Sequence, residues 1–103
     1  DSDTGIAVLE VQAPEQVISK LQHVKFARAG AVIPGRDVLV LGRTEGGQML
    51  MAASGMVSCA ARTLLTFRGD PVHDIIQTDR PFAPGFDGGP MFDTQGYLLG
   101  MTA

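Results

Sequence analysis

A glycine-rich segment close to the C-terminal end holds the residues best suited to chemistry. Residues 84–90, Pro-Gly-Phe-Asp-Gly-Gly-Pro, surround Asp87 with three glycines and follow the polar run Gln77-Thr78-Asp79. Glycines allow successive backbone N–H groups to converge on one point, and such a nest binds an anion. In acyl-transfer enzymes a nest of this kind stabilises the oxyanion, with the nucleophile on the same turn. Taken alone, Gly88-Gly89-Pro90 is better explained by a tight turn.

The two histidines, His23 and His73, offer only a weak metal site. His73 lies beside Asp74 and three residues after Asp70, so one nitrogen and two carboxylates could serve a metal ion. Adjacent residues of a strand point to opposite faces, however, and His73 and Asp74 would therefore not chelate together. A solvated turn is the simpler interpretation. His73 and Asp70 stay as weak candidates, and we expect no metal and no cofactor.

The sulfur-containing residues favour a packed interior. Cys59 is the single cysteine, which excludes an internal disulfide and a CxxC zinc site. It lies in an apolar run, where an inert thiol is expected rather than a reactive one. Core packing also explains the five methionines more simply than copper binding does. They are Met49, Met51, Met56, Met91 and Met101.

Composition limits the classes of protein to consider. The chain has 103 residues, 45% of them hydrophobic and 18% charged, which fits one domain or one lobe and excludes a disordered tail. A net charge of −3 argues against a nucleic-acid-binding surface. Apolar runs such as Val38-Leu39-Val40-Leu41 are far shorter than the roughly 20 residues that span a bilayer. We therefore expect no membrane span in this segment.

The elements that must position the glycine-rich segment are short strands. Thirteen glycines, nearly double the usual share of about 7%, and six prolines predict many tight turns. Short strands at spacings of 8–12 residues indicate an all-β protein. The segment 62–67 is predicted to pair with the bent strand before it, and 80–89 to form an irregular loop. Strands are expected over 6–11, 24–27, 38–42, 49–61, 62–67, 73–79, 90–92 and 97–101, with a weak helix over 15–22.

The segment 75–90 resembles the nucleophile region of trypsin-fold serine proteases of the HtrA/Deg family. That region runs I-Q-T-D, a short loop and G-N-S-G-G-P, and its hairpin ends in G-I-N-T-A. Here Ile-Gln-Thr-Asp ends at Asp79, eight residues before Asp87, and the chain closes Gly-Met-Thr-Ala. Upstream, 34–42 resembles V-G-D-x-V-x-A-I-G, 54–58 resembles S-G-I-V-S, and 1–9 resembles D-P-x-x-D-L-A-V-L. The collinear match covers nearly the whole chain.

The resemblance implies an all-β fold, a trypsin-like (chymotrypsin-fold) lobe of a six-stranded antiparallel β-barrel that is incomplete as given. Residues 1–12 would be the end of the first barrel, with the catalytic-aspartate segment, and 13–103 would be most of the second. Residues 85–89 would be the former oxyanion loop. Met101, Thr102 and Ala103 would line the cleft. A barrel ending here exposes strand edges, so we expect further segments, a complementing chain or an oligomer contact to cover them.

Two positions depart from the family pattern in a way that bears on catalysis. Asp87 stands where the nucleophilic serine is expected, and Gly5 stands where the catalytic aspartate is expected. The histidine segment would precede Asp1. The family mechanism needs a hydroxyl activated by an imidazole that a carboxylate orients. Because the hydroxyl and the orienting carboxylate are both replaced, we predict a pseudo-protease and not an enzyme.

The resemblance leaves three functions open. The first is a non-catalytic module that binds a polypeptide or protein partner for scaffolding or regulation. The second is a serine-type endopeptidase whose catalytic residues lie outside this chain or are altered in it. The third is a repurposed metal-binding module, as in the HtrA-like proteins of magnetosome-forming bacteria. The family also suggests the bacterial periplasm or envelope as the compartment.

The loop around Asp87 has two expected arrangements. The Asp87 carboxylate either folds back onto the N–H groups of Gly85 and Asp87, or the loop collapses and turns one N–H outward. Phe86 replaces a polar residue, and its ring would seek a neighbouring apolar wall. We expect collapse, because an empty nest is strained.

Overall fold

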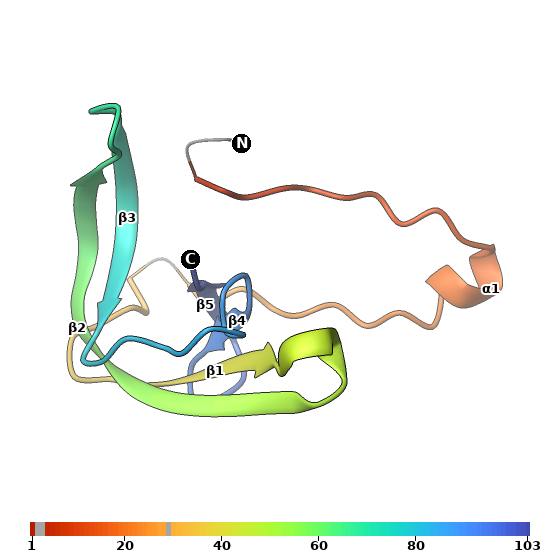
Figure 1. Cartoon of the computed structure of the whole chain (residues 1–103). Helices are drawn as coiled ribbons and strands as arrows, with labels where there is room; N and C mark the ends of the chain where they lie inside the picture. Colours follow the sequence, from red (N-terminus) through yellow and green to blue (C-terminus); the bar gives the residue numbers. More distant parts are fainter. Residues whose placement is uncertain (2–3, 29) are drawn as a thin grey trace.

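The protein, described here as a computed structural model over residues 1, 4–28 and 30–103, consists of one curled antiparallel sheet and an extended N-terminal arm (Figure 1). The strand order is β3-β2-β1-β4-β5. The all-β prediction is confirmed, with five strands in the described part of the chain. The elements are α1 (Glu15–Ile18), β1 (Asp37–Arg43), the 3-10 turn η1 (Glu45–Gly47), β2 (Leu50–Leu65), β3 (Pro71–Thr78), β4 (Pro90–Phe92) and β5 (Leu98–Met101).

Strand β1 is the centre of the sheet and carries the core. It pairs with β2 on one side and with β4 on the other. Alternate residues of a strand share a face, and Val38 and Val40 are 2% and 0% exposed. They pack with Val57 of β2, Met91 of β4 and Phe86 of the loop before β4. The core therefore joins the central strand directly to the glycine-rich loop.

The β1–β2 connection is a hairpin, as its glycines predict. Gly46 and Gly47 have φ angles of 80° and 71°, a region that residues other than glycine seldom adopt. The Thr44 N–H donates to the Met49 carbonyl oxygen at 2.9 Å and closes the turn. The hairpin places Leu39 opposite Ser54 and Asp37 opposite Met56.

The prediction that 62–67 forms a separate partner strand is wrong. Strand β2 runs without a break to Leu65, and its partner at this end is β3, which follows the turn at residue 69. The register shifts between Cys59 and Arg62, where Ala61 has a φ of 55°. An irregularity of this kind bends a strand without reversing it. The β2–β3 pair consequently projects from the sheet (Figure 1).

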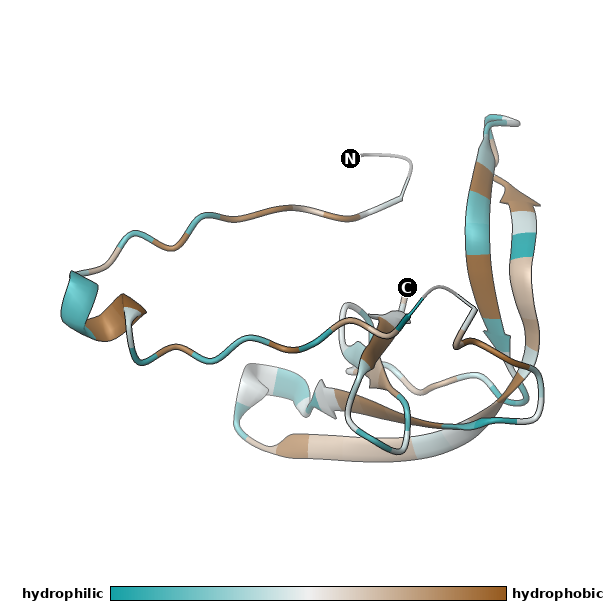
Figure 2. Cartoon of the chain, turned by 180° about the vertical axis from the view of Figure 1, so that it is seen from behind, coloured by the Kyte–Doolittle hydropathy of each residue, from teal (hydrophilic) through white to brown (hydrophobic). Residues whose placement is uncertain are grey.

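The N-terminal arm forms no regular strand among the described residues, so the strands predicted over 6–11 and 24–27 are wrong. A strand needs a second backbone to satisfy its N–H and C=O groups, and the described chain places none beside 6–11. Val8 and Leu9 are consequently 94% and 86% exposed. Near 24–27 a single parallel bridge joins Phe26 to Leu98. Figure 2 shows the apolar residues along the arm.

The helix predicted over 15–22 is real but shorter. It occupies one turn, α1, after Pro14, and no side chain caps its first turn. None of the helices found in residues 1, 4–28 and 30–103 is long and apolar enough to cross a membrane.

Candidate functional site

The glycine-rich loop is irregular, as predicted, and consists of two consecutive turns. The Phe86 N–H donates to the Ala83 carbonyl oxygen at 3.3 Å, and the Gly89 N–H donates to the Phe86 carbonyl oxygen at 2.8 Å. Gly85 and Gly88 occupy the third position of these turns with φ angles of 99° and 77°. Such angles are typical of glycine in a type II turn. The two turns therefore depend on glycine at both positions.

Three glycines allow the loop to approach β1 closely. A Cβ atom on Gly42 would lie 2.4 Å from the Gly85 carbonyl oxygen, and one on Gly85 would lie 2.7 Å from the Arg43 carbonyl oxygen. At Gly89 a Cβ atom would lie 2.0 Å from the carbonyl oxygen of Leu41. The Arg43 N–H uses this approach to donate to Gly85 at 3.0 Å. The end of β1 thus fixes the position of the loop.

Phe86 anchors the loop in the core. Its side chain is 7% exposed and packs with Val38, Val40, Val57 and Met91. The Phe82 ring lies beside it, with the centroids 6.0 Å apart and the planes tilted by 50°. Burial of a whole phenyl ring favours this arrangement by about 2–3 kcal/mol relative to an exposed ring. The ring occupies an apolar wall, as expected for phenylalanine at this position.

Thr102 holds the loop from the opposite side. Its hydroxyl donates to the Phe86 carbonyl oxygen and accepts from the Gly89 N–H at 3.2 Å. Its backbone continues the contact, because the Gly88 N–H donates to Thr102 at 2.8 Å and the Thr102 N–H donates to Gly89 at 2.9 Å. From the sequence, Thr102 is expected to line the cleft, and its role in anchoring the loop is not predicted. That Met101, Thr102 and Ala103 line a cleft stays a prediction.

Asp87 lies at the exposed apex of the second turn. Among the described residues its carboxylate has no hydrogen-bond or ion-pair partner, so it does not fold back onto the loop. The N–H groups of Gly85 and Asp87 likewise donate to no acceptor in the part of the chain that the structure describes. The loop therefore presents two unused amides and one carboxylate. Whether the amides point to one centre, against the expected collapse, stays a prediction.

Gly5 lies in the arm and supplies no functional group. Its φ is 73°, its N–H donates to the Asp1 carbonyl oxygen at 2.9 Å, and a Cβ atom there would meet nothing within 4 Å. No hydrogen bond among the described residues connects Gly5 with the loop 85–89. Gly5 and Asp87, at the positions where the aspartate and the serine are expected, are thus not joined by a hydrogen bond among the described residues.

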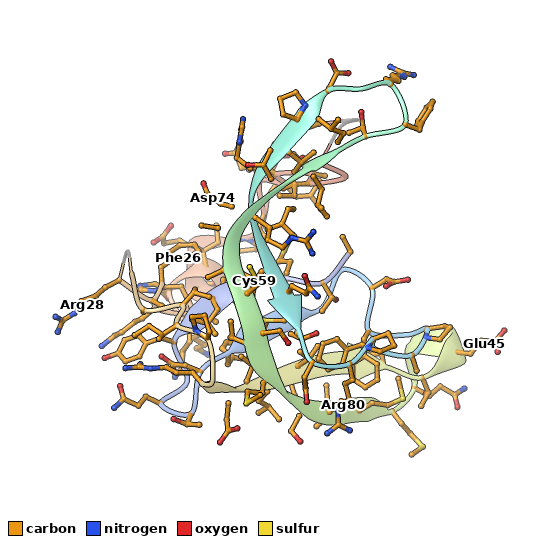
Figure 3. The ribbon with its side chains drawn as sticks, turned by 90° about the vertical axis from the view of Figure 1, so that its left-hand side faces the viewer. Phe26, Arg28, Glu45, Cys59, Asp74 and Arg80 are labelled. Carbon is orange, nitrogen blue, oxygen red and sulfur yellow. The ribbon has the colours of Figure 1, made fainter. Side chains whose placement is uncertain are left out.

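The weak metal candidates are not part of a cluster. His73 Nδ1 lies 3.1 Å from Thr63 Oγ1 across the β2–β3 pair, and the Asp70 N–H donates to Thr66 Oγ1 at 3.2 Å. Over residues 1, 4–28 and 30–103, no three His, Cys, Asp or Glu side chains lie close enough to hold a metal ion. Figure 3 shows Asp74 beside the β2–β3 pair and the half-buried Cys59 farther down it.

Comparison with known proteins places these features in context. The trypsin-like peptidase domain model matches residues 1–101. "Protease Do-like 1, chloroplastic" of Arabidopsis thaliana is 31% identical over 102 residues, which are 98% of this chain and 22% of the relative. "Probable periplasmic serine endoprotease DegP-like" of Marinomonas sp. (strain MWYL1) is 32% identical over 103 residues, all of this chain and 20% of the relative. The chain thus spans about a fifth of the length of these curated relatives.

Two solved structures have the same fold. Deg5 has a TM-score of 0.63 and 27% identity, covering 78% of this chain and 38% of that one. The MamO protease domain from Magnetospirillum magneticum has a TM-score of 0.58 and 27% identity, covering 68% and 36%. The predicted trypsin-like fold and the resemblance to HtrA/Deg proteases are confirmed by these matches.

Proposed function

Because the chain belongs to the trypsin-like peptidase domain family, we propose that it is an HtrA-like pseudo-protease module that binds polypeptide for scaffolding or regulation. The observation that carries this proposal is that Asp87 stands where the nucleophilic serine is expected. It lies at the apex of a turn whose backbone hydrogen bond is formed. A carboxylate there cannot act as the hydroxyl nucleophile of a serine protease. The two turns, their glycines and their contacts with β1 nevertheless remain.

The surroundings of Asp87 argue against catalysis by its own carboxylate. A carboxylate is already ionised near neutral pH, so as a nucleophile it would need a positioned general acid to protonate the leaving group. No imidazole lies in the loop, and both histidines, His23 and His73, are on other elements. Gly5, the second replaced position, offers no carboxylate that could orient a histidine.

The same loop has the groups that binding a polypeptide needs. The N–H groups of Gly85 and Asp87 are free to donate to peptide carbonyl oxygens, and Phe86 and Thr102 hold the turn in place. A ligand that meets a preorganised loop loses less free energy to ordering it. We assign residues 1–12 to the end of a first barrel and 13–103 to most of a second, with the loop at the surface of the second.

The alternative is a serine-type endopeptidase whose catalytic residues lie outside this chain or are altered in it. The names of the relatives favour this alternative, since the relative from Marinomonas is called a serine endoprotease. The metal-binding alternative has no support from a ligand cluster among the described residues.

Unfolded casein distinguishes the two leading functions. We expect the full-length protein to bind fluorescein-labelled casein, measured by anisotropy, and to release no peptides above a buffer control. The Asp87→Ala variant serves as the matched control and should give the same background. Steady cleavage that Asp87→Ala abolishes would overturn the proposal, and so would the absence of any casein binding.

A further inference from the structure

The outward face of the β1–β2 hairpin carries apolar side chains where an antiparallel sheet is usually polar. Asp37 lies opposite Met56, and Leu39 lies opposite both Ser54 of β2 and Phe92 of β4. Directly opposed residues share a face, and this face is the reverse of the one that buries Val38 and Val40. Leu39 and Met56 are 41% and 39% exposed. A solvated sheet face normally alternates to polar residues.

Two walls turn this face into a groove with a volume of about 1040 Å³. One wall is Asp79 and Arg80 after β3, and the other is the β4–β5 turn over residues 93–96. The volume reaches the upper end of the roughly 300–1,000 Å³ that suits a single small ligand. Strand β1 is paired on both sides, so its backbone cannot accept an added strand. Recognition in this groove must therefore use side chains.

The charged groups of the groove are mostly carboxylates. Asp37, Asp79 and Asp93 are in its lining, together with one cationic residue, Arg80. Asp79 Oδ1 accepts from the Met56 N–H at 2.9 Å, and Asp93 Oδ1 accepts from the N–H groups of Gln95 and Tyr97, both at 2.9 Å. Two of the three carboxylates are thus held in fixed orientations. Asp37 is exposed and has no partner among the described residues.

We propose that this groove binds an extended, basic peptide segment of a partner protein, in which lysine or arginine alternates with apolar residues. The apolar side chains would cover Leu39, Met56 and Phe92, while the cations would meet the carboxylates at the rim. Complementary charge across an interface selects the partner and speeds association. A second copy of this chain, with its net charge of −3, has the wrong overall sign.

The groove is separate from the glycine-rich loop, so this inference goes beyond the proposed function. The loop contacts the end of β1 over Leu41, Gly42 and Arg43, whereas the groove is lined by Asp37, Val38 and Leu39 at its start. The variants used in the test below lie in the groove or at Asp70, and none of them lies in the loop 85–89.

The test uses a fluorescein-labelled nine-residue peptide of alternating lysine and leucine, with a glutamate–leucine peptide as its counterpart. Anisotropy titrations should show binding of the basic peptide only, weakening as NaCl rises from about 50 to 300 mM because salt screens exposed charges. Asp37→Lys should weaken binding about tenfold, since it removes one attraction and adds one repulsion. Asp70→Lys, the same change outside the groove, should alter it less than about twofold.

The variant Leu39→Thr changes the apolar face of the groove. It should weaken binding several-fold, because it removes apolar contact from an exposed strand position. Thermal unfolding of each variant checks that it folds, and Asp37→Asn is the milder substitute if Asp37→Lys does not. Equal losses in Asp37→Lys and Asp70→Lys would overturn the proposal, as would equal binding of the acidic peptide. Sedimentation that shows a dimer dissociated by Asp37→Lys would assign the groove to a second copy instead.

Discussion

The backbone of Gly89 packs so closely on β1 that a Cβ atom there would lie 2.0 Å from the carbonyl oxygen of Leu41. This contact joins the glycine-rich loop to the central strand of the sheet. Neither partner is a side chain that could rotate away. An alanine at this position must therefore displace either the loop or the strand.

We expect Gly89→Ala to lower the free energy of unfolding by about 2–3 kcal/mol, the upper range for an overpacked site. Urea denaturation followed by circular dichroism measures this change. Gly100→Ala is the matched control, because a Cβ atom there meets only the Ile76 side chain at an ordinary 3.6 Å. A Gly89→Ala variant as stable as Gly100→Ala would show that the loop does not rest on Leu41.

Phe86 should contribute more to stability than any other side chain of the loop. Phe86→Ala removes a buried ring from the core and should cost about 3–5 kcal/mol. Phe67→Ala, at a ring that is 95% exposed, should change stability by less than about 0.5 kcal/mol. Urea midpoints of the two variants make the comparison. Similar midpoints would mean that the ring does not anchor the loop.

Thr102 tests the hydrogen bonds that hold the loop. Thr102→Val keeps the shape but removes the hydroxyl that donates to Phe86 and accepts from Gly89. We expect a loss of about 0.5–1.5 kcal/mol, because two hydrogen bonds of the hydroxyl are lost while the Gly89 N–H still donates to the Phe86 carbonyl oxygen. Thr102→Ser keeps the hydroxyl and should recover most of this loss. If Thr102→Val is as stable as the unmodified protein, the hydroxyl does not hold the loop.

Asp79 should stabilise the junction between β3 and the loop. Its N–H donates to the Met56 carbonyl oxygen and its Oδ1 accepts from the Met56 N–H, both at 2.9 Å. Asp79→Ala removes the second bond and should cost about 1 kcal/mol. Asp87→Ala removes a carboxylate that has no partner among the described residues, and should be neutral within about 0.5 kcal/mol. Equal thermal midpoints for the two variants would contradict the role given to Asp79.

Local patterns were sufficient to predict the strands that pair with a neighbour in the chain. The run Val38–Leu41, the Glu45-Gly46-Gly47 turn and the closing hairpin were all found, because turn chemistry and alternation are local properties. The run over 6–11 is also mostly apolar but forms no strand. Its partner, if it has one, lies outside the described residues, and no local pattern reveals that.

The site shows the same division between local and long-range information. The glycines at 85, 88 and 89 predicted tight turns, and the turns are present. The approach of Gly89 to Leu41 and the hydrogen bonds of Thr102 could not be predicted, because they join segments far apart in the sequence. The bend at Ala61 was missed for a different reason. Ala61 has a positive φ, which alanine seldom adopts. The sequence therefore gives no sign that β2 bends at this residue and then continues.

The central proposal is that Asp87 and Gly5 leave this chain without the groups for peptide hydrolysis, and one variant tests it directly. Asp87→Ser restores the hydroxyl at the loop but leaves Gly5, which cannot orient a histidine. We predict that the full-length Asp87→Ser protein, treated with a serine-directed phosphonate, is labelled no faster than the unmodified protein. Rapid, stoichiometric labelling of Asp87→Ser, confirmed at position 87 by mass spectrometry, would contradict the account.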